Sequence, residues 1–205
     1  DKALAAGAVH VSAYVLTVES GTPLVQLIAQ RKRAAVDDDA QASAYERIQQ
    51  LLPARGLHQY EISSFARPGH ESAHNRLYWG GAPYLGLGPS AHSMRHDAHG
   101  RTLRRQTTAR FDSWVRDPIA AAHELEVLEP RHALVEAVAF GLRDLLGGID
   151  LEALGQRHAV DARFLAPVLA ASARAGDVEL AGAVARLTPQ GARFADRVAR
   201  AVLAA

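Results

Sequence analysis

The stretch that most restricts the fold is a nearly continuous apolar run close to the start of the chain, residues 9–18. A helix-like segment, residues 2–6, precedes it, and Gly7 separates the two. Near-continuous apolar strands are typical of parallel sheets, which are covered on both faces. A helix, a short loop and a buried strand form the repeating unit of α/β folds. We therefore expect an α/β protein with a buried parallel strand over residues 9–18.

Polar residues mark the starts of two further helices. Thr22 followed by Pro23 is a favourable start, because proline fits the first helical position. Three aspartates, residues 37–39, suit the positive end of a second helix. Consecutive residues on a helix do not face one another, which favours a solvated cap over a metal cluster. We expect this helix to end near Gly56 and a strand to follow over residues 60–65.

Glycines alternate with other residues within residues 84–93. Glycine weakens a strand interior, so this pattern indicates close backbone approach to another strand or to a ligand. The segment lacks the spacing and the lysine of a P-loop, which disfavours nucleotide phosphate. Residues 95–118 are predicted to form a solvated loop or hairpin, and His96 and His99 do not have the pattern of a metal site.

The character of the sequence changes at residue 130. The elements expected after this point are a helix over 132–146, short capped helices after Asp150 and Asp161, two strands within 178–187 and a helix over 189–204. This order resembles a winged helix, so we predict two domains, residues 1–129 and 130–205. The charges of the second domain are mixed and form no basic stripe, so nucleic acid is not an expected partner.

Composition excludes several kinds of site. The 205 residues include 23 Lys and Arg, 22 Asp and Glu, and no cysteine. Without thiolates the chain cannot build a disulfide or hold an iron–sulfur cluster. It has no run of about 20 apolar residues and no signal peptide, so we expect a soluble, cytoplasmic protein. Because the chain starts at Asp1 and its one methionine is Met94, we expect a fragment of a longer product.

A polar and aromatic hexapeptide, residues 74–79, is the strongest candidate for a site. It contains His74, Asn75, Tyr78 and Trp79. Ligand pockets combine a few convergent polar groups with apolar and aromatic walls, and this segment supplies both. The alternative is that the two aromatic residues belong to the core and have satisfied polar tips. The residues alone leave both interpretations open.

Consecutive blocks of the sequence resemble HemW, the heme-chaperone branch of the radical SAM family that also contains oxygen-independent coproporphyrinogen III oxidase. These blocks are HVSAYVLTVESGTP (10–23), YEISSFARPG (60–69), HNRLYW (74–79) and YLGLGPSAHS (84–93). The segments EAVAFGLR (136–143) and LTPQG (187–191) are similar to the C-terminal domain of the family. The pattern His-Asn-x-x-Tyr-Trp separates HemW-like proteins from the true oxidase, and it is intact here.

The resemblance implies the C-terminal part of a partial (β/α) radical SAM barrel, followed by a small winged-helix-like helical domain. The family's barrel holds a [4Fe-4S] cluster and S-adenosylmethionine through a Cys-x-x-x-Cys-x-x-Cys motif in its N-terminal part. This chain has no cysteine, so we assign the cluster and S-adenosylmethionine to the full-length parent and expect no catalytic residue here. A barrel without its first strands exposes an unpaired edge, from which we expect marginal stability or self-association into a homo-oligomer.

The resemblance also implies heme binding and delivery of heme to respiratory proteins. It is compatible with peripheral contact of the protein with a membrane. His74 is the expected axial ligand of the heme iron, since a neutral imidazole is a common donor. Asn75 would orient it through a hydrogen bond. Tyr78 and Trp79 would offer ring faces to the macrocycle.

Several alternatives stay open at this point. Arg76 or Arg67 is the expected partner of a propionate, because guanidinium matches carboxylate geometry. His70 and His92 are rival iron ligands. The parent could instead oxidise coproporphyrinogen III, or the chain could be a nonenzymatic winged-helix interaction module or a truncated remnant.

Overall fold

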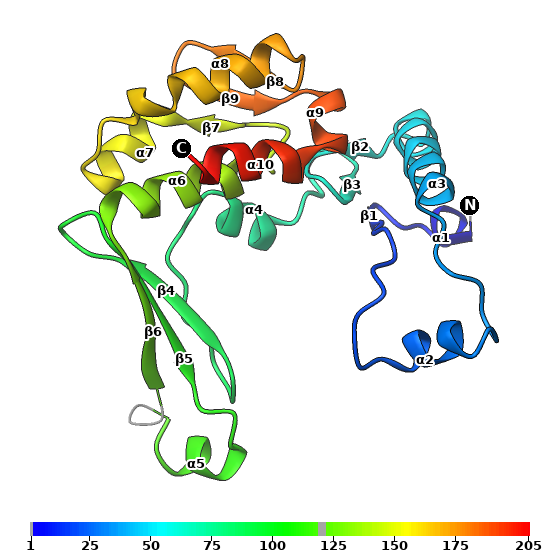
Figure 1. Cartoon of the computed structure of the whole chain (residues 1–205), viewed down its shortest axis with the longest axis horizontal. Helices are drawn as coiled ribbons and strands as arrows, with labels where there is room; N and C mark the ends of the chain where they lie inside the picture. The colour runs from blue at the N-terminus through cyan, green and yellow to red at the C-terminus, as the bar shows by residue number, and fades with distance from the viewer. Residues whose placement is uncertain (1, 119–121) are drawn as a thin grey trace. The chain divides into compact units, whose positions relative to one another are not determined.

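The computed structural model describes residues 2–118 and 122–205 (Figure 1). The chain divides into two units, residues 1–71 and 72–205. The expected domain boundary at residues 129 and 130 lies inside the second unit, between a strand and a helix, and it stays a prediction. Within the described ranges, no helix has the length and apolar character needed to cross a membrane.

The first unit is a small three-stranded antiparallel sheet with helices. Its elements are α1 (Lys2–Ala5), β1 (His10–Ser12), α2 (Pro23–Ala29), α3 (Asp38–Leu51), the 3-10 helix η1 (Pro53–Arg55), β2 (His58–Gln59) and β3 (Ser64–Ala66). The strand order is β1-β3-β2. Leu52, Leu57 and Phe65 form the buried core of this unit, so α3 covers the sheet through its C-terminal end.

The prediction of a buried parallel strand over residues 9–18 is wrong in length and direction. The strand β1 is three residues long and pairs antiparallel with β3. Tyr14 is 75% exposed, and Val15 and Leu16 are also exposed. A parallel strand needs partners and helices on both faces. The part of the chain that the structure describes gives β1 only β3 as a neighbour, so the apolar run continues beyond the sheet.

The predicted helix starts are confirmed, whereas the second predicted strand begins too early. Asp37 caps α3 by accepting a hydrogen bond of 3.1 Å from the Ala40 backbone N–H. Residues 60–63 form a turn between β2 and β3, since the Tyr60 N–H donates to the Ser64 carbonyl. The alternation of apolar and polar residues over 60–65 therefore comes from a hairpin turn and not from a strand.

The second unit begins with α4 (Ala73–Trp79) and an antiparallel sheet. The sheet has the order β4-β5-β6, with β4 (His92–His96), β5 (Thr102–Thr107) and β6 (Ala122–Leu128). The helix α5 (Phe111–Arg116) lies between β5 and β6 in the chain. Figure 1 shows this sheet as a long twisted ribbon with α5 beyond its far end. The predicted hairpin over residues 95–118 is confirmed, and β6 was not anticipated.

The alternating glycines mark a close approach of two chain segments, as predicted. A Cβ atom on Gly86 would overlap with the backbone oxygen of His92. Tyr84 and Met94 exchange two backbone hydrogen bonds of 2.9 Å across this contact. The Gly86 N–H also donates to the Ser93 hydroxyl oxygen at 3.0 Å. The neighbour that requires glycine is therefore β4.

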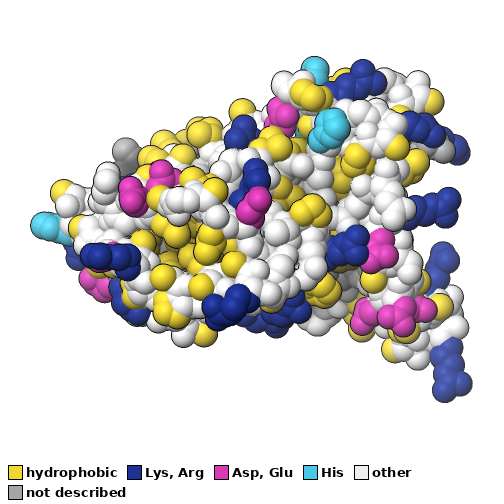
Figure 2. Space-filling view, turned by 90° about the horizontal axis from the view of Figure 1, so that it is seen from above, with side chains coloured by type: hydrophobic (Ala, Val, Ile, Leu, Met, Phe, Trp, Pro, Cys, Tyr) yellow, Lys and Arg dark blue, Asp and Glu magenta, His cyan; other side chains and the backbone are white. Residues whose placement is uncertain are grey.

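A winged-helix-like arrangement completes the second unit, as predicted. It consists of α6 (Pro130–Gly141), β7 (Ile149–Asp150), α7 (Leu151–His158), the 3-10 helix η2 (Ala162–Leu165), α8 (Ala166–Arg174), β8 (Val178–Ala181), β9 (Val184–Leu187), α9 (Pro189–Arg193) and α10 (Ala195–Leu203). Its three strands have the antiparallel order β7-β9-β8. On the face that Figure 2 presents, positive and negative side chains are interspersed.

Two helices of this region end earlier than the sequence suggested. The helix α6 stops at Gly141 instead of residue 146, and a Cβ atom on Gly141 would overlap with the Ile149 side chain. The Asp144 carboxylate then accepts the backbone N–H groups of two following residues, at 2.9 and 3.0 Å, and fixes a turn. The predicted last helix is broken into α9 and α10 at Phe194.

Candidate functional site

The hexapeptide forms the helix α4, which ordinary capping explains. Ser72 is its N-cap and accepts a hydrogen bond of 3.2 Å from the Asn75 backbone N–H. Gly80 follows the last helical residue, and Gly81 turns the chain with φ +65°. A left-handed residue after a helix suits glycine, which carries no Cβ. The helix is short and exposed, so its position depends on its contacts with other elements.

Three aromatic rings form a row along one side of α4. The ring centroids of His74 and Tyr78 are 4.8 Å apart in an edge-on arrangement. Tyr78 in turn contacts Tyr84, at 4.6 Å. Residues four apart share a helix face, so the sequence spacing alone brings His74 to Tyr78. The His74 imidazole is exposed and makes no hydrogen bond to any described residue, which leaves a ring nitrogen available to a ligand.

Trp79 lies on a different side of the helix and is half-buried. The Arg143 guanidinium carbon is 5.0 Å from the centre of its ring, a cation–π contact. Its Nε1 atom is buried and has no hydrogen-bond partner among residues 2–118 and 122–205. Because Arg143 already occupies one ring face, Trp79 can offer a ligand only the remaining surface. The expectation that both aromatic residues present ring faces thus stays a prediction, with Tyr78 better placed.

The supporting residues predicted around His74 have other contacts. Asn75 makes no hydrogen bond to His74, because adjacent side chains on a helix diverge. Arg76 forms an ion pair with Asp144 at 3.2 Å. Arg67 and the rival ligand His70 are exposed residues of the first unit. A propionate would therefore have to compete with Asp144 for Arg76.

A cavity of about 360 Å³ adjoins α4. It is bounded by α4, β4, β5 and α6 and is lined mainly by aromatic and apolar side chains. The lining includes Tyr78, Trp79, Tyr84, His92, Met94, His96, Thr102, Arg104, Glu136 and Phe140. Arg104 forms ion pairs with Glu126 and Glu136, so its charge is already neutralised. From the hexapeptide, Tyr78 and Trp79 line this cavity and His74 does not, whereas His92, the other rival ligand, does.

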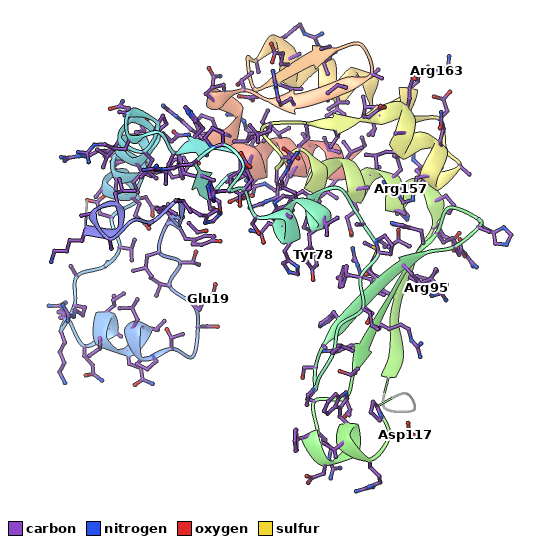
Figure 3. All side chains as sticks on the ribbon, turned by 180° about the vertical axis from the view of Figure 1, so that it is seen from behind. Glu19, Tyr78, Arg95, Asp117, Arg157 and Arg163 are labelled. Atoms are coloured by element: carbon purple, nitrogen blue, oxygen red, sulfur yellow. The ribbon has the colours of Figure 1, made fainter. Side chains whose placement is uncertain are left out.

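The end of α4 is fixed by two side chains that the sequence did not identify. The His96 Nε2–H donates to the Gly81 carbonyl at 2.8 Å, and its Nδ1 lies 3.1 Å from the Thr102 hydroxyl. The Arg157 guanidinium donates to the Gly80 carbonyl, also at 2.8 Å. Side-chain N–H donors at a helix C-terminus satisfy its free carbonyls. Tyr78 on α4 and Arg157 on α7 can be followed in Figure 3.

His158 is a fully buried histidine behind this contact. Its Nδ1–H donates to the Gly100 carbonyl at 2.9 Å, and its ring meets that of His96 edge-on at 5.2 Å. Its Nε2 atom has no partner among the described residues. Burial lowers the pKa of His158 below its ordinary value of 6.5, the hydrogen bond to Gly100 opposes this in part, and the charge of Arg157 lowers the pKa further. The imidazole is therefore neutral in the folded protein near neutral pH.

We expect acid to destabilise the second unit through His158. As pH falls below about 6.5, the unfolded chain takes up this proton before the folded chain does, so the free energy of unfolding decreases. The stabilisation is fully present above that pH. Urea unfolding at about pH 7.5 and about pH 5.5 should show a smaller pH effect for His158→Gln than for the unchanged chain. The exposed His132→Gln serves as control, and an equal reduction in both variants would contradict this assignment.

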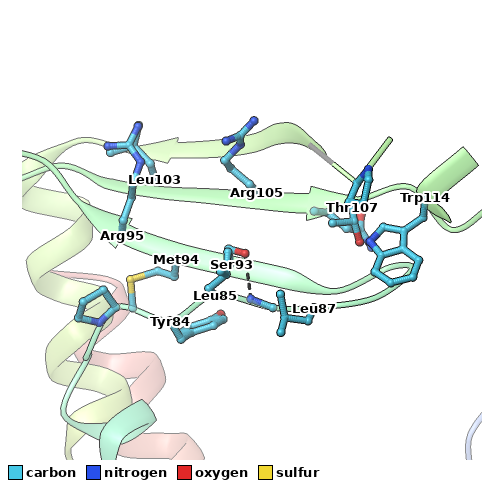
Figure 4. A pocket seen from close by; sticks show the side chains of 14 residues that line it. Tyr84, Leu85, Leu87, Ser93, Met94, Arg95, Leu103, Arg105, Thr107 and Trp114 are labelled. Carbon is cyan, nitrogen blue, oxygen red and sulfur yellow. Dashed lines mark hydrogen bonds between the residues drawn. The ribbon is translucent and has the colours of Figure 1, made fainter. Parts of the chain in front are cut away.

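A second cavity, of about 570 Å³, lies along the sheet (Figure 4). Figure 4 shows Arg95, Leu103 and Arg105 on one side of the strands and Tyr84 and Met94 on the other. Most of its remaining lining is apolar. It shares Tyr84 and Met94 with the cavity beside α4, so the strand β4 contributes to both.

The chemistry of this chain does not fit an iron–sulfur cluster. It has no cysteine, and thiolates are the ligands that such clusters use. In the part of the chain that the structure describes, no three His, Asp or Glu side chains are grouped so as to hold a metal ion. A heme needs fewer protein ligands, since the macrocycle itself supplies the others.

Comparison with known proteins finds relatives that are named as HemW or as a radical S-adenosyl methionine domain-containing protein. The heme chaperone HemW of Mycobacterium tuberculosis (strain ATCC 25618 / H37Rv) is 47% identical over 92 residues, which cover 45% of this chain and 24% of that protein. HemW of Escherichia coli (strain K12) is 36% identical over 136 residues, or 62% of this chain and 35% of that protein. A mitochondrial radical S-adenosyl methionine domain-containing protein 1 of Bos taurus is 37% identical over 150 residues, which cover 67% of this chain and 33% of that protein.

The chain thus spans about a third or less of the length of these relatives, between 24% and 35%. No family model matches it. Among solved structures, the radical SAM enzyme coproporphyrinogen III oxidase (HemN) of Escherichia coli aligns with a TM-score of 0.59 and 19% identity. The alignment covers 89% of this chain and 46% of that structure, which supports a common fold.

Proposed function

We propose, for a chain that is HemW-like in sequence and shares the fold of a radical SAM enzyme, that α4 and the cavity beside it bind heme as cargo. The observation that carries the proposal is the row His74, Tyr78 and Tyr84, in which an imidazole with a free nitrogen contacts the ring of Tyr78 and Tyr78 contacts the ring of Tyr84. A heme presents iron at its centre and a broad apolar surface around it. This row offers a ligand for the first and contact area for the second.

Each residue has a defined part in this proposal. His74 ligates the iron through its neutral imidazole. Tyr78 packs against that ring and against Tyr84, and so limits the rotation of the ligand. His96 and Arg157 hold the end of α4 in place through its last carbonyl groups. The macrocycle would lie over the mouth of the cavity, with its propionates toward solvent.

The role of the longer protein extends this proposal. The two bacterial relatives are named heme chaperones, and we propose that the full-length parent delivers its heme to respiratory proteins in the cytoplasm. The proposed contact between heme and α4 requires neither the iron–sulfur cluster nor S-adenosylmethionine. Heme binding by α4 can therefore be tested on this chain alone.

Hemin titration tests the proposal. We expect His74→Ala to weaken hemin binding at least about tenfold, because disturbing only the groups that support a metal ligand already costs about 10–100-fold. The affinity is measured from the Soret absorption band. His99→Ala is the matched control, since His99 is an exposed histidine of the β4–β5 turn and lines neither cavity. Equal affinities for His74→Ala, His99→Ala and the unchanged chain would exclude His74 as the ligand.

A further inference from the structure

We infer that His92 is a second iron ligand, which binds the same heme as His74 from the strand β4. The inference rests on the proposed function, because it concerns the same heme. In an antiparallel sheet, alternate residues face the same side. His92, Met94 and His96 follow this alternation on β4, and all three line the cavity beside α4. His74 does not line this cavity itself, but its ring contacts Tyr78, which does.

Of the groups on this face of β4, only His92 is free to bind a metal. Both ring nitrogens of His96 already have partners, the Gly81 carbonyl and the Thr102 hydroxyl. Met94 exchanges two backbone hydrogen bonds with Tyr84, and its thioether is a weaker donor than an imidazole. The side chain of His92 is exposed at the edge of the cavity and makes no hydrogen bond to any residue that the structure describes.

The backbone of His92 is held more firmly than its exposure suggests. Gly86 approaches the His92 carbonyl so closely that no Cβ fits between them. The neighbouring residue Ser93 accepts a hydrogen bond of 3.0 Å from the Gly86 N–H, and His92 pairs with Gln106 of β5. A ligand on a rigid element loses little conformational entropy when it binds. The glycine-rich segment therefore has a use beyond packing, because it positions a metal ligand.

The remaining walls of the cavity fit a macrocycle better than an isolated ion. Tyr78, Tyr84 and Phe140 supply ring surfaces, and Arg104 is neutralised by its two glutamate partners. Among the residues that the structure describes, no three His, Asp or Glu side chains are grouped here so as to hold a bare cation. Heme iron needs only one or two axial ligands from the protein. Two separate histidines are consequently sufficient for heme.

The coordination of the ferric heme tests this inference. With two histidine ligands the complex of the unchanged chain should be six-coordinate and low-spin, and His92→Ala should convert it to a five-coordinate, high-spin form. We also expect hemin affinity to fall about tenfold, in the range seen when the support of a metal ligand is disturbed. Absorption and electron paramagnetic resonance spectra report the spin state. His92→Met should restore a low-spin complex with a different absorption spectrum.

The outcomes separate this inference from the proposed function. A low-spin spectrum of His92→Ala identical to that of the unchanged chain, or a high-spin unchanged chain, would overturn the role of His92. If His74→Ala still weakens binding in that case, the proposed function stands without the second ligand. If neither variant changes binding, both proposals fail. Unchanged urea midpoints confirm that the variants fold, and His99→Ala should match the unchanged chain throughout.

Discussion

Leu134→Ala should lower the free energy of unfolding of the second unit by about 2–5 kcal/mol, the range for removal of a buried leucine side chain. Leu134 is completely buried on α6. That helix packs against α10 and α7, and its neighbour Val138 is also fully buried. The truncation leaves a cavity that rigid neighbours cannot fill, so the site on the same unit loses its support.

Urea unfolding followed by far-ultraviolet circular dichroism measures this loss. Leu203→Ala is the matched control, because Leu203 is a leucine of the same unit that is 52% exposed. We expect its effect to stay within about 0.5 kcal/mol. Equal losses for the two leucines would show that α6 is not the centre of the core.

Gly100→Ala should be the second most damaging change. Gly100 has φ +79°, a conformation that costs a residue with a Cβ about 1–2 kcal/mol. In addition, a Cβ at this position would overlap with the backbone oxygen of His158. Relieving that overlap requires a backbone shift worth about 1–3 kcal/mol. The shift would separate the β4–β5 turn from α7 and break the hydrogen bond between His158 and Gly100.

Gly182→Ala measures the backbone strain without the steric overlap. Gly182 also has a positive φ, +62°, but nothing lies within 4 Å of its Cβ position. Its replacement should therefore cost only the backbone strain. The difference between the two unfolding free energies measures the contact with His158, and no difference would show that the contact relaxes freely.

Local signals in the sequence predicted the helix starts well. Asp37 and Asp150 both accept a backbone N–H in the first turn of the helix that follows them. Such caps involve neighbours within four residues, so no knowledge of the rest of the chain is needed. The apolar run over residues 9–18 is the opposite case. Its pattern is typical of a strand, but pairing depends on other strands, and only residues 10–12 pair here.

The sequence predicted the part of the site that depends on contacts between near neighbours in the chain. The spacing of His74 and Tyr78 on one helix places their rings in contact, and the sequence contains that information. The contacts of His96, Arg157 and His158 join residues far apart in the chain, and single histidines and arginines carry no signal of such contacts. The alternating glycines did indicate close packing, although the sequence could not say that His92 was the residue being held.

The aromatic residues of the hexapeptide make two different sets of contacts in the structure. His74 and Tyr78 lie together on the side of α4 that adjoins Tyr84, whereas Trp79 packs with Arg143. The pattern His-Asn-x-x-Tyr-Trp therefore combines two tasks. One half supplies the proposed heme contact, and the other anchors α4 to the winged-helix-like part of the unit.

The most direct test of heme ligation by α4 uses the absence of cysteine from this chain. His74→Cys introduces the only thiol, so a thiolate-ligated ferric heme can arise only from position 74. We expect the absorption and electron paramagnetic resonance spectra of this variant with hemin to change from histidine to thiolate ligation. A spectrum identical to that of the unchanged chain would contradict the assignment of His74 as the iron ligand.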